Sequence, residues 1–224
     1  MFILLMVITA IPAYILGSVN GAIITSKLFY RKDIRDYGSG NPGLTNFYRT
    51  FGKGGFLLVL LIDVIKTVAP VILGGMLFAH FTDMVLTEVG PLYRFFELTY
   101  FGQVLAGFFV MLGHCFPLFY KFKGGKGVMA IGAIVIVVDW RLALISWGVF
   151  IIVTLLTRYV SLGAILGCIA FPISMRLFDV GGLAEFNIVI LCVLLVIIRH
   201  IPNIKRLFKG EESKLKLKRS KEPG

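Results

Sequence analysis

The chain has 224 residues, of which 58% are hydrophobic and only 16% are charged, and its formal net charge is +11. Soluble domains average about 45–50% apolar and about 25% charged residues, so the composition predicts an integral membrane protein and excludes a disordered one. Proteins that bind nucleic acid gather Lys and Arg on one solvated face, whereas these basic residues lie in short stretches between apolar runs. We therefore expect no nucleic-acid partner.

Uncharged runs predict seven membrane spans. They lie at residues 1–26, 54–82, 98–120, 127–138, 142–157, 159–175 and 186–198. A helix needs about 20 residues to cross a hydrocarbon core about 30 Å thick, and the fourth run would reach only about 18 Å. Residues 127–157 are therefore either two full spans or a re-entrant hairpin. The apolar N-terminus lacks a basic flank, so it is expected to be kept as a span.

The basic residues are distributed unevenly between the two sides of such a bundle. The connections that begin at residues 27, 121, 158 and 199 contain 19 of the 23 Lys and Arg residues, and the alternate connections contain three. Because cytoplasmic connections carry the excess of Lys and Arg, the N-terminus is predicted outside and the C-terminus in the cytoplasm. The expected fold is an all-α, polytopic membrane helix bundle with seven transmembrane helices.

Two parts of the chain are expected. Residues 1–204 form a single transmembrane domain, and residues 205–224 form a basic cytoplasmic tail without an apolar run. Such a tail is expected to be solvated or to touch anionic lipid, and binding of a partner is the alternative.

The first predicted cytoplasmic connection contains the sequence GSGNPGLTNFYR at residues 38–49. Glycines allow backbone N–H groups to approach an anion closely, and hydroxyl, amide and guanidinium groups supply further donors. The stretch predicts a cradle for a phosphate or carbonyl group. A turn-rich loop between helices is the alternative.

The second connection contains FKGGKG at residues 122–127, directly before an apolar segment that is expected to be helical. Glycines and a lysine at a helix N-terminus combine free N–H groups, the positive end of the helix dipole and a mobile ammonium, which together favour anions. The stretch does not match the P-loop pattern. Alternatively, Lys121, Lys123 and Lys126 serve only to orient the spans.

The third and fourth connections are short. Arg158 and Ser161 have the ordinary interpretation of an interface anchor and a helix cap. His200 and Asn203 are three residues apart, so they share a helix face if the helix continues that far. Pro202 permits this only if it begins a new turn.

Two pairs of polar residues inside predicted spans call for an interpretation. Asp63 and Lys66 are charged in a hydrocarbon setting, so they form either a structural ion pair or part of a wet site beside the active centre. Ser18 and Asn20 are interpreted as small residues that allow close helix packing.

The chain offers no expected metal site. Its three histidines are scattered without ligand spacing, and its three cysteines lie in apolar runs where they act as small hydrophobes. Few acidic residues lie on the predicted cytoplasmic side, which argues against transfer chemistry that depends on a metal ion.

Four segments resemble one family. GSGNPGLTN at 38–46, LGHCFPLFYKFKGGKG at 112–127, TRYVSLGAI at 157–165 and RHIPNIKRL at 199–207 are similar, in that order, to segments of the bacterial acyl-phosphate:glycerol-3-phosphate acyltransferases, the PlsY family. The likeness extends to LGSVNGAIITSKLF at 16–29 and LIDVIKT at 61–67. Departures are modest. One is Val19-Asn20 in place of a common Ile-Pro, which affects local packing.

The resemblance implies an activity and a place in the cell. A fatty acyl group passes from acyl phosphate to the 1-hydroxyl of glycerol 3-phosphate, which gives lysophosphatidic acid and inorganic phosphate for phospholipid biosynthesis. No cofactor is implied. The partners are the two substrates, membrane lipids and the soluble enzyme that supplies acyl phosphate. The location is the bacterial inner (plasma) membrane, with the active site facing the cytoplasm.

The resemblance also implies roles for individual residues. Implied catalytic residues are Ser39, Asn41, Arg49, Lys126, Ser161, His200 and Asn203. Implied residues for binding substrate or phosphate are Gly40, Gly43, Thr45, Asn46, Lys123, Gly124 and Gly125, with Asp63 and Lys66 in support. Because acyl phosphate is a mixed anhydride with a good leaving group, orientation and charge stabilisation can suffice. The hydroxyl attacks directly, and its proton goes to a donor phosphate oxygen or to His200.

Three other classes of protein are weighed against this hypothesis. A transporter of a phosphorylated solute predicts internal repeats and sites at the membrane midplane, but the chain shows no convincing repeat. Another kind of lipid acyltransferase would carry His-x-x-x-x-Asp, and no histidine here has Asp five positions later. A structural scaffold leaves four polar motifs unexplained.

Overall fold

The computed structural model describes the backbone of residues 2–82 and 91–215, and every regular element in these ranges is a helix. The all-α prediction is confirmed for this part of the chain. The elements are α1 Phe2–Gly17, α2 Gly21–Tyr30, η1 Ile34–Asp36, α3 Leu44–Phe51, α4 Phe56–Thr82, α5 Pro91–Cys115, η2 Leu118–Tyr120, α6 Val128–Val138, α7 Trp140–Thr157, α8 Val160–Phe178, α9 Leu183–Arg199 and α10 Ile201–Phe208.

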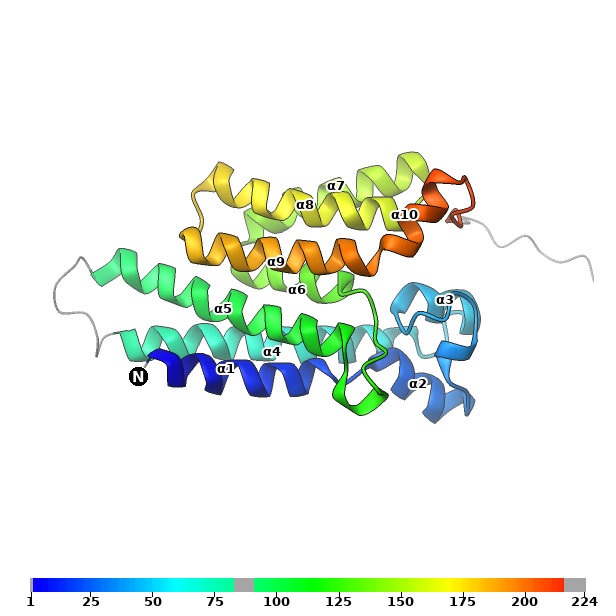
Figure 1. Ribbon diagram of the computed structural model, residues 1–224, viewed down its shortest axis with the longest axis horizontal. Coiled ribbons are helices and arrows are strands. Elements are labelled where there is room, and N and C mark those ends of the chain that lie inside the picture. The colour runs from blue at the N-terminus through cyan, green and yellow to red at the C-terminus, as the bar shows by residue number, and fades with distance from the viewer. Residues whose placement is uncertain (1, 83–90, 216–224) are drawn as a thin grey trace, which may run out of the picture.

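The long helices run side by side along one axis, and the short helices α2, α3 and α10 lie together at one end of the bundle (Figure 1). The chain begins at the opposite end, beside the start of α1. All four glycine-rich or polar connections of the sequence therefore meet at the end that holds α2, α3 and α10. This is the arrangement that an alternating series of spans predicts.

The apolar helices are long enough for a membrane protein. Five described spans satisfy length and hydropathy for crossing a bilayer, and a sixth does so if α9 and α10, bent by 56° at their junction, count together. With 11 residues, α6 is shorter than a bilayer requires. Large apolar side chains such as Ile3, Leu156 and Leu177 project outward at 70% exposure or more, as they do where lipid replaces water.

The core of the bundle is built around α6. Its residues Ile131, Ile134 and Val135 are buried, and α6 packs against α4, α5, α7 and α8. A single residue, Asp139, separates α6 from α7, and its carboxylate caps α7 by accepting a hydrogen bond of 2.7 Å from the Arg141 N–H. The Trp147 indole donates to the Gly132 carbonyl at 3.1 Å, so α6 and α7 pack antiparallel.

Glycines allow α1, α4 and α5 to pack closely. A Cβ atom at Gly17 would lie 2.3 Å from the Val110 carbonyl oxygen, and one at Gly74 would lie 2.6 Å from that of Gly102. Real Cβ atoms do not approach so closely, so these positions require glycine. Small residues at helix contacts are typical of bundles in membranes.

The first apolar run is not one continuous helix, because it breaks between Gly17 and Gly21. Asn20 caps α2 by accepting from the Ile23 N–H at 2.9 Å, and its amide donates to the Pro42 carbonyl at 3.1 Å. Ser18 accepts from the Leu118 N–H at 3.2 Å. Ser18 and Asn20 are buried, as their interpretation as packing residues predicts, and both side chains also tie the first span to loops of the polar end.

The predicted tail differs from expectation. The boundary at residue 204 falls inside α10, and residues 209–215 fold back toward the start of α8, where the Leu215 N–H donates to the Arg158 carbonyl at 2.7 Å. Residues 205–215 are thus tied to α8 and the connection before it by side-chain and backbone hydrogen bonds, while most of their side chains are exposed, as expected for a solvated tail. Residues 216–224 lie outside the described part of the chain.

Candidate active site

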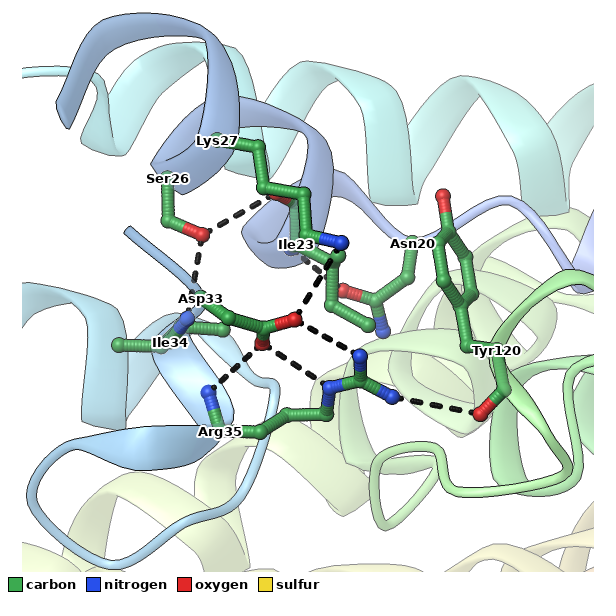
Figure 2. A network of polar contacts seen from close by, with 8 residues as sticks. All are labelled: Asn20, Ile23, Ser26, Lys27, Asp33, Ile34, Arg35 and Tyr120. Atoms are coloured by element: carbon green, nitrogen blue, oxygen red, sulfur yellow. Dashed lines mark hydrogen bonds and ion pairs between the residues drawn. The ribbon is translucent and has the colours of Figure 1, made fainter. Parts of the chain in front are cut away.

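A network of ionic contacts fixes the start of the first connection (Figure 2). Asp33 accepts hydrogen bonds from the Arg35 backbone N–H at 3.0 Å and from its guanidinium at 2.9 and 2.7 Å, and Lys27 lies 3.4 Å away. The guanidinium also donates to the Tyr120 carbonyl at 3.3 Å. The bond from Arg35 holds the pKa of Asp33 at about 2, below its usual value. This network joins the first connection to the second.

The glycine-rich loop at residues 38–43 is shaped by Asn46 of α3. The Asn46 amide donates to the carbonyls of Tyr37 at 3.0 Å and Ile34 at 3.4 Å, and its oxygen accepts from the Ser39 N–H at 3.0 Å. Gly38 has a φ of +60°, in the region that favours glycine. Because its polar atoms are engaged by the loop, the structure places Asn46 as the residue that shapes the cradle.

In the second connection, the two glycines do not have the anion-binding role that the sequence predicts. The N–H groups of Gly124 and Gly125 donate to the carbonyls of Cys115 at 3.2 Å and His114 at 3.0 Å. Their own carbonyls accept from the Arg199 guanidinium at 2.8 and 3.0 Å. These amides are therefore engaged and are not offered to an anion. Instead, the turn delivers Lys126 to the N-terminus of α6.

A polar cluster surrounds Lys126 at the end of the bundle. The Lys126 ammonium donates to Asn203 Oδ1 at 2.5 Å, and Asn203 Nδ2 donates to Glu212 Oε1 at 2.7 Å. The same Glu212 oxygen accepts from Ser161 Oγ at 2.7 Å, and its other oxygen accepts from Arg206 Nε at 2.7 Å. The second connection, α8, α10 and the segment after α10 thus converge on one cluster.

The charged groups in this cluster shift one another's pKa values. Burial lowers the pKa of Lys126 to about 8; Glu212 opposes this shift, whereas Arg206, Arg199 and Arg49 add to it. Burial raises the pKa of Glu212, but its hydrogen bonds outweigh burial and hold this pKa below its usual value. Lys126 is therefore an ammonium that gives up its proton more readily than an exposed lysine.

His200 lies at the junction of α9 and α10 and is 3% exposed. Its Nδ1 lies 2.8 Å from the Val196 carbonyl oxygen. A carbonyl only accepts, so Nδ1 carries the hydrogen and Nε2 of the neutral ring has a free lone pair. The side chain can therefore accept a proton at Nε2.

Asp63 and Lys66 form a buried ion pair in α4, with side chains 2% and 4% exposed and a distance of 2.7 Å. Lys66 also lies 2.6 Å from the Val19 carbonyl oxygen and 2.9 Å from His114 Nδ1. The pair thus braces the break in the first span and the helix that carries the second connection. Asp63 reaches the cavity, and its Oδ2 has no hydrogen-bond partner among the residues that the structure describes.

These elements enclose a cavity of about 1040 Å³ that has a polar end and an apolar arm. The polar end is lined by Ser39, Asn41, Gly43, Thr45, Asn46, Arg49, Lys126, Ser161, His200, Asn203, Arg206 and Glu212. The arm runs between α4, α6, α7 and α8 and is lined by residues that include Leu60, Ile131, Val135, Trp147, Phe150, Ala164, Cys168 and Phe171.

All seven residues for which catalytic roles are implied line this cavity. Some residues with implied binding or supporting roles lie outside the cavity lining. They are Gly40, Lys123, Gly124, Gly125 and Lys66. Sequence reasoning missed Arg206 and Glu212, which it treated as part of a solvated tail. An acidic pair, Glu211 and Glu212, in an otherwise basic stretch was the available signal.

The fold and cavity define a helical protein of the membrane type in which a polar end lined by Arg49, Lys126 and Arg206 continues into an apolar arm. The sequence model of the family described as glycerol-3-phosphate acyltransferase matches residues 7–210. The chain belongs to the glycerol-3-phosphate acyltransferase family.

Individual relatives cover nearly the whole chain. A glycerol-3-phosphate acyltransferase of Staphylococcus carnosus is 36% identical over 95% of this chain and 99% of its own length. One of Thermoanaerobacter pseudethanolicus is 37% identical over 93% and 95%.

Two crystal structures of PlsY (YgiH), an integral membrane glycerol 3-phosphate acyltransferase, are also similar. Its glycerol 3-phosphate form has a TM-score of 0.77 and 30% identity over 94% of this chain and 96% of that one. Its lysophosphatidic acid form has a TM-score of 0.75 and 29% identity over 94% and 95%.

Proposed function

We propose that the chain transfers a fatty acyl group from acyl phosphate to the 1-hydroxyl of glycerol 3-phosphate, which yields lysophosphatidic acid and inorganic phosphate for phospholipid synthesis. The observation that carries the proposal is a single cavity that joins a cationic end to an apolar arm. Acyl phosphate has the same two parts, a phosphate head and an apolar tail. The two ligand forms of the related PlsY structure support glycerol 3-phosphate and its acylated product as occupants.

The polar end supplies cations for two phosphate groups. Arg49 of α3, Lys126 and Arg206 of α10 line it, and the N-terminus of α6 opens beside Lys126 with Gly127 as its cap. N–H groups at a helix N-terminus favour phosphate, and a guanidinium can bind phosphate through two parallel hydrogen bonds. We assign the donor phosphate to Lys126 and α6, and the phosphate of glycerol 3-phosphate to the side that holds Arg49.

The reaction needs one bond to form and one to break. The 1-hydroxyl oxygen bonds to the acyl carbon, the bond between that carbon and the phosphate oxygen breaks, and phosphate leaves with the electron pair. The proton of the hydroxyl goes either to an oxygen of the departing phosphate or to His200 Nε2, whose lone pair is free. The cations lower the barrier by stabilising charge on the leaving phosphate.

The remaining implied roles are proposed in the same way. Ser39, Asn41 and Thr45 offer hydroxyl and amide groups to substrate, and Asn203 holds Lys126. Ser161 lines the same end, and the Asp63–Lys66 pair supports the second connection. Gly40, Gly43, Gly124 and Gly125 shape the loops rather than hold the ligand.

We further propose seven crossings in the bacterial inner membrane, with the N-terminus outside, the short helix α6 as one of the seven, and the polar end in the cytoplasm. Its support is the excess of Lys and Arg in the connections of that end. A cytoplasmic site also suits a donor that a soluble enzyme supplies. Residues 1–204 then contain all seven residues with implied catalytic roles, and the described part of the tail adds Arg206 and Glu212 to the site.

One donor comparison tests the proposed function. The purified protein in lipid vesicles receives glycerol 3-phosphate and either acyl phosphate, acyl-CoA or acyl-loaded carrier protein. We expect lysophosphatidic acid from acyl phosphate alone. Product from acyl-CoA or carrier protein but not from acyl phosphate contradicts the proposed donor, and uptake of glycerol 3-phosphate without product favours a transporter.

A further inference from the structure

Glu212 places a carboxylate beside Arg49, Lys126 and Arg206 at the polar end of the cavity. Its side chain is 8% exposed and accepts hydrogen bonds of 2.7 Å from Ser161, Asn203 and Arg206. These partners come from α8 and α10, and Ser161 is 51 residues away along the chain. A carboxylate that has been withdrawn from water and receives three hydrogen bonds is a fixed part of the structure.

The hydrogen bonds of Glu212 determine which way the Asn203 amide points. A carboxylate only accepts, so the Asn203 group that faces Glu212 must be the NH₂. The amide oxygen must then face the opposite way, where it accepts from the Lys126 ammonium at 2.5 Å. Without the carboxylate, the two ends of the amide could exchange, and the NH₂ would then face the ammonium.

Lys126 retains donors for a ligand in this arrangement. An ammonium has three N–H donors, and Asn203 takes one of them. The charged groups around Lys126 are Arg49 on α3, Arg199 on α9, Arg206 on α10 and Glu212 itself. His200, on the junction of α9 and α10, also feels the charge of Lys126. Glu212 is the one anion among these groups, so it favours the ammonium form.

The segment that carries Glu212 is held in place at both ends. The Glu211 N–H donates to the Arg206 carbonyl at 2.8 Å, and the Leu215 N–H donates to the Arg158 carbonyl at 2.7 Å. Gly210 turns the chain back with a φ of +72°. The Lys214 ammonium lies 5.6 Å from the centre of the Tyr159 ring. The carboxylate is therefore delivered to the site by a defined strap, residues 209–215.

From this geometry we propose that Glu212 is a positioning residue for the acyl transfer: it orients the Asn203 amide and so holds the Lys126 ammonium in place for phosphate. The inference rests on the proposed function of the site. It implies that the strap is part of the active form of the enzyme and is not an inhibitory segment that substrate must displace.

Two variants and one matched control test the inference in vesicles that contain the full chain. Glu212→Ala removes the acceptor, Glu212→Gln keeps one acceptor oxygen without the charge, and Glu211→Gln changes the exposed neighbour. With acyl phosphate as donor, we expect kcat/KM to fall at least tenfold for Glu212→Ala and less for Glu212→Gln, with Glu211→Gln unchanged. Unfolding midpoints in detergent identify any variant that fails to fold, and Glu212→Gln then carries the test.

The pH profile separates positioning from mere support of the fold. An opposite charge nearby raises the pKa of an ammonium, so loss of the Glu212 charge should lower the pKa of Lys126. For Glu212→Gln we expect the alkaline fall in activity to begin about 0.5–1 pH unit lower than in the wild type. An unchanged alkaline limb overturns the proposal, and so does activity equal to or above that of the wild type for Glu212→Ala.

Binding of inorganic phosphate, the leaving group assigned to Lys126, is measured by calorimetry at pH 7 and pH 9 and keeps this test distinct from that of the proposed function. It requires no donor and no turnover. A steeper loss of binding between these pH values in Glu212→Gln than in the wild type supports the role of Glu212 even if acyl phosphate proves to be the wrong donor. Equal losses in both proteins contradict it.

Discussion

Replacement of Lys126 by alanine removes one positive charge and its donors from the polar end of the cavity. A hydrogen bond to a charged group contributes about 1.5–3 kcal/mol net, and one preorganised donor toward developing charge contributes about 2.7–4 kcal/mol. Arg49 and Arg206 remain, so binding should not vanish. We expect kcat/KM for acyl phosphate to fall about 100- to 1000-fold.

The assay follows release of inorganic phosphate together with formation of lysophosphatidic acid in vesicles. Lys121→Ala is the matched control, because Lys121 lies in the same connection but is exposed and outside the cavity lining. A loss of less than about fivefold for Lys126→Ala, or an equal loss for Lys121→Ala, would refute the assignment of Lys126 to the donor phosphate.

The pH dependence gives the same prediction a second test. Because the pKa of Lys126 is lowered to about 8, the ammonium is present below that pH and is lost as the pH rises through it. Wild-type activity should therefore decline near pH 8. An arginine keeps its charge at every relevant pH, so Lys126→Arg should be less active but should lack this decline.

Three further changes test the elements that build the site. Gly125→Ala should lower kcat/KM at least tenfold, because its Cβ would lie 2.2 Å from His114 Nε2. Gly148→Ala should not, because a Cβ there would meet no packing neighbour within 4 Å among the described residues; equal effects of the two variants would contradict the prediction. Asp33→Ala removes the acceptor that holds the Arg35 side chain, so proteolysis of residues 31–43 should become faster. An unchanged rate of cleavage would show that the network does not hold the loop. Cys168→Phe narrows the apolar arm, so the preference of the enzyme among donors of different length should shift toward shorter acyl chains. An unchanged chain-length preference would exclude the arm as the acyl site.

Local composition predicted most of the helices. An apolar run is recognised from its own residues, and so is an excess of Lys and Arg in alternate connections. The start of α6 after FKGGKG was predicted within one residue, because glycines and lysines mark that boundary. The break at Asn20 was missed: its side chain caps α2 locally and also donates to the Pro42 carbonyl, a partner 22 residues away that an uncharged run does not reveal.

The site was predicted where one segment carries its own chemistry and missed where segments meet. The residues of GSGNPGLTN mostly line the cavity, as a glycine-rich anion cradle should. The role of Gly124 and Gly125 could not be predicted from spacing, because their N–H groups donate to carbonyls of α5 and their own carbonyls accept from the guanidinium of Arg199. Glu212 is defined only by the fold, since its partners reach it from two helices.

A single-turnover measurement tests direct acyl transfer from acyl phosphate most directly. The enzyme, in excess over acyl phosphate labelled in its phosphate, is mixed with the donor first without and then with glycerol 3-phosphate. Direct attack predicts no phosphate release until glycerol 3-phosphate is added, followed by one phosphate for each lysophosphatidic acid formed. A burst of phosphate without glycerol 3-phosphate, or lysophosphatidic acid formed without release of labelled phosphate, would contradict it.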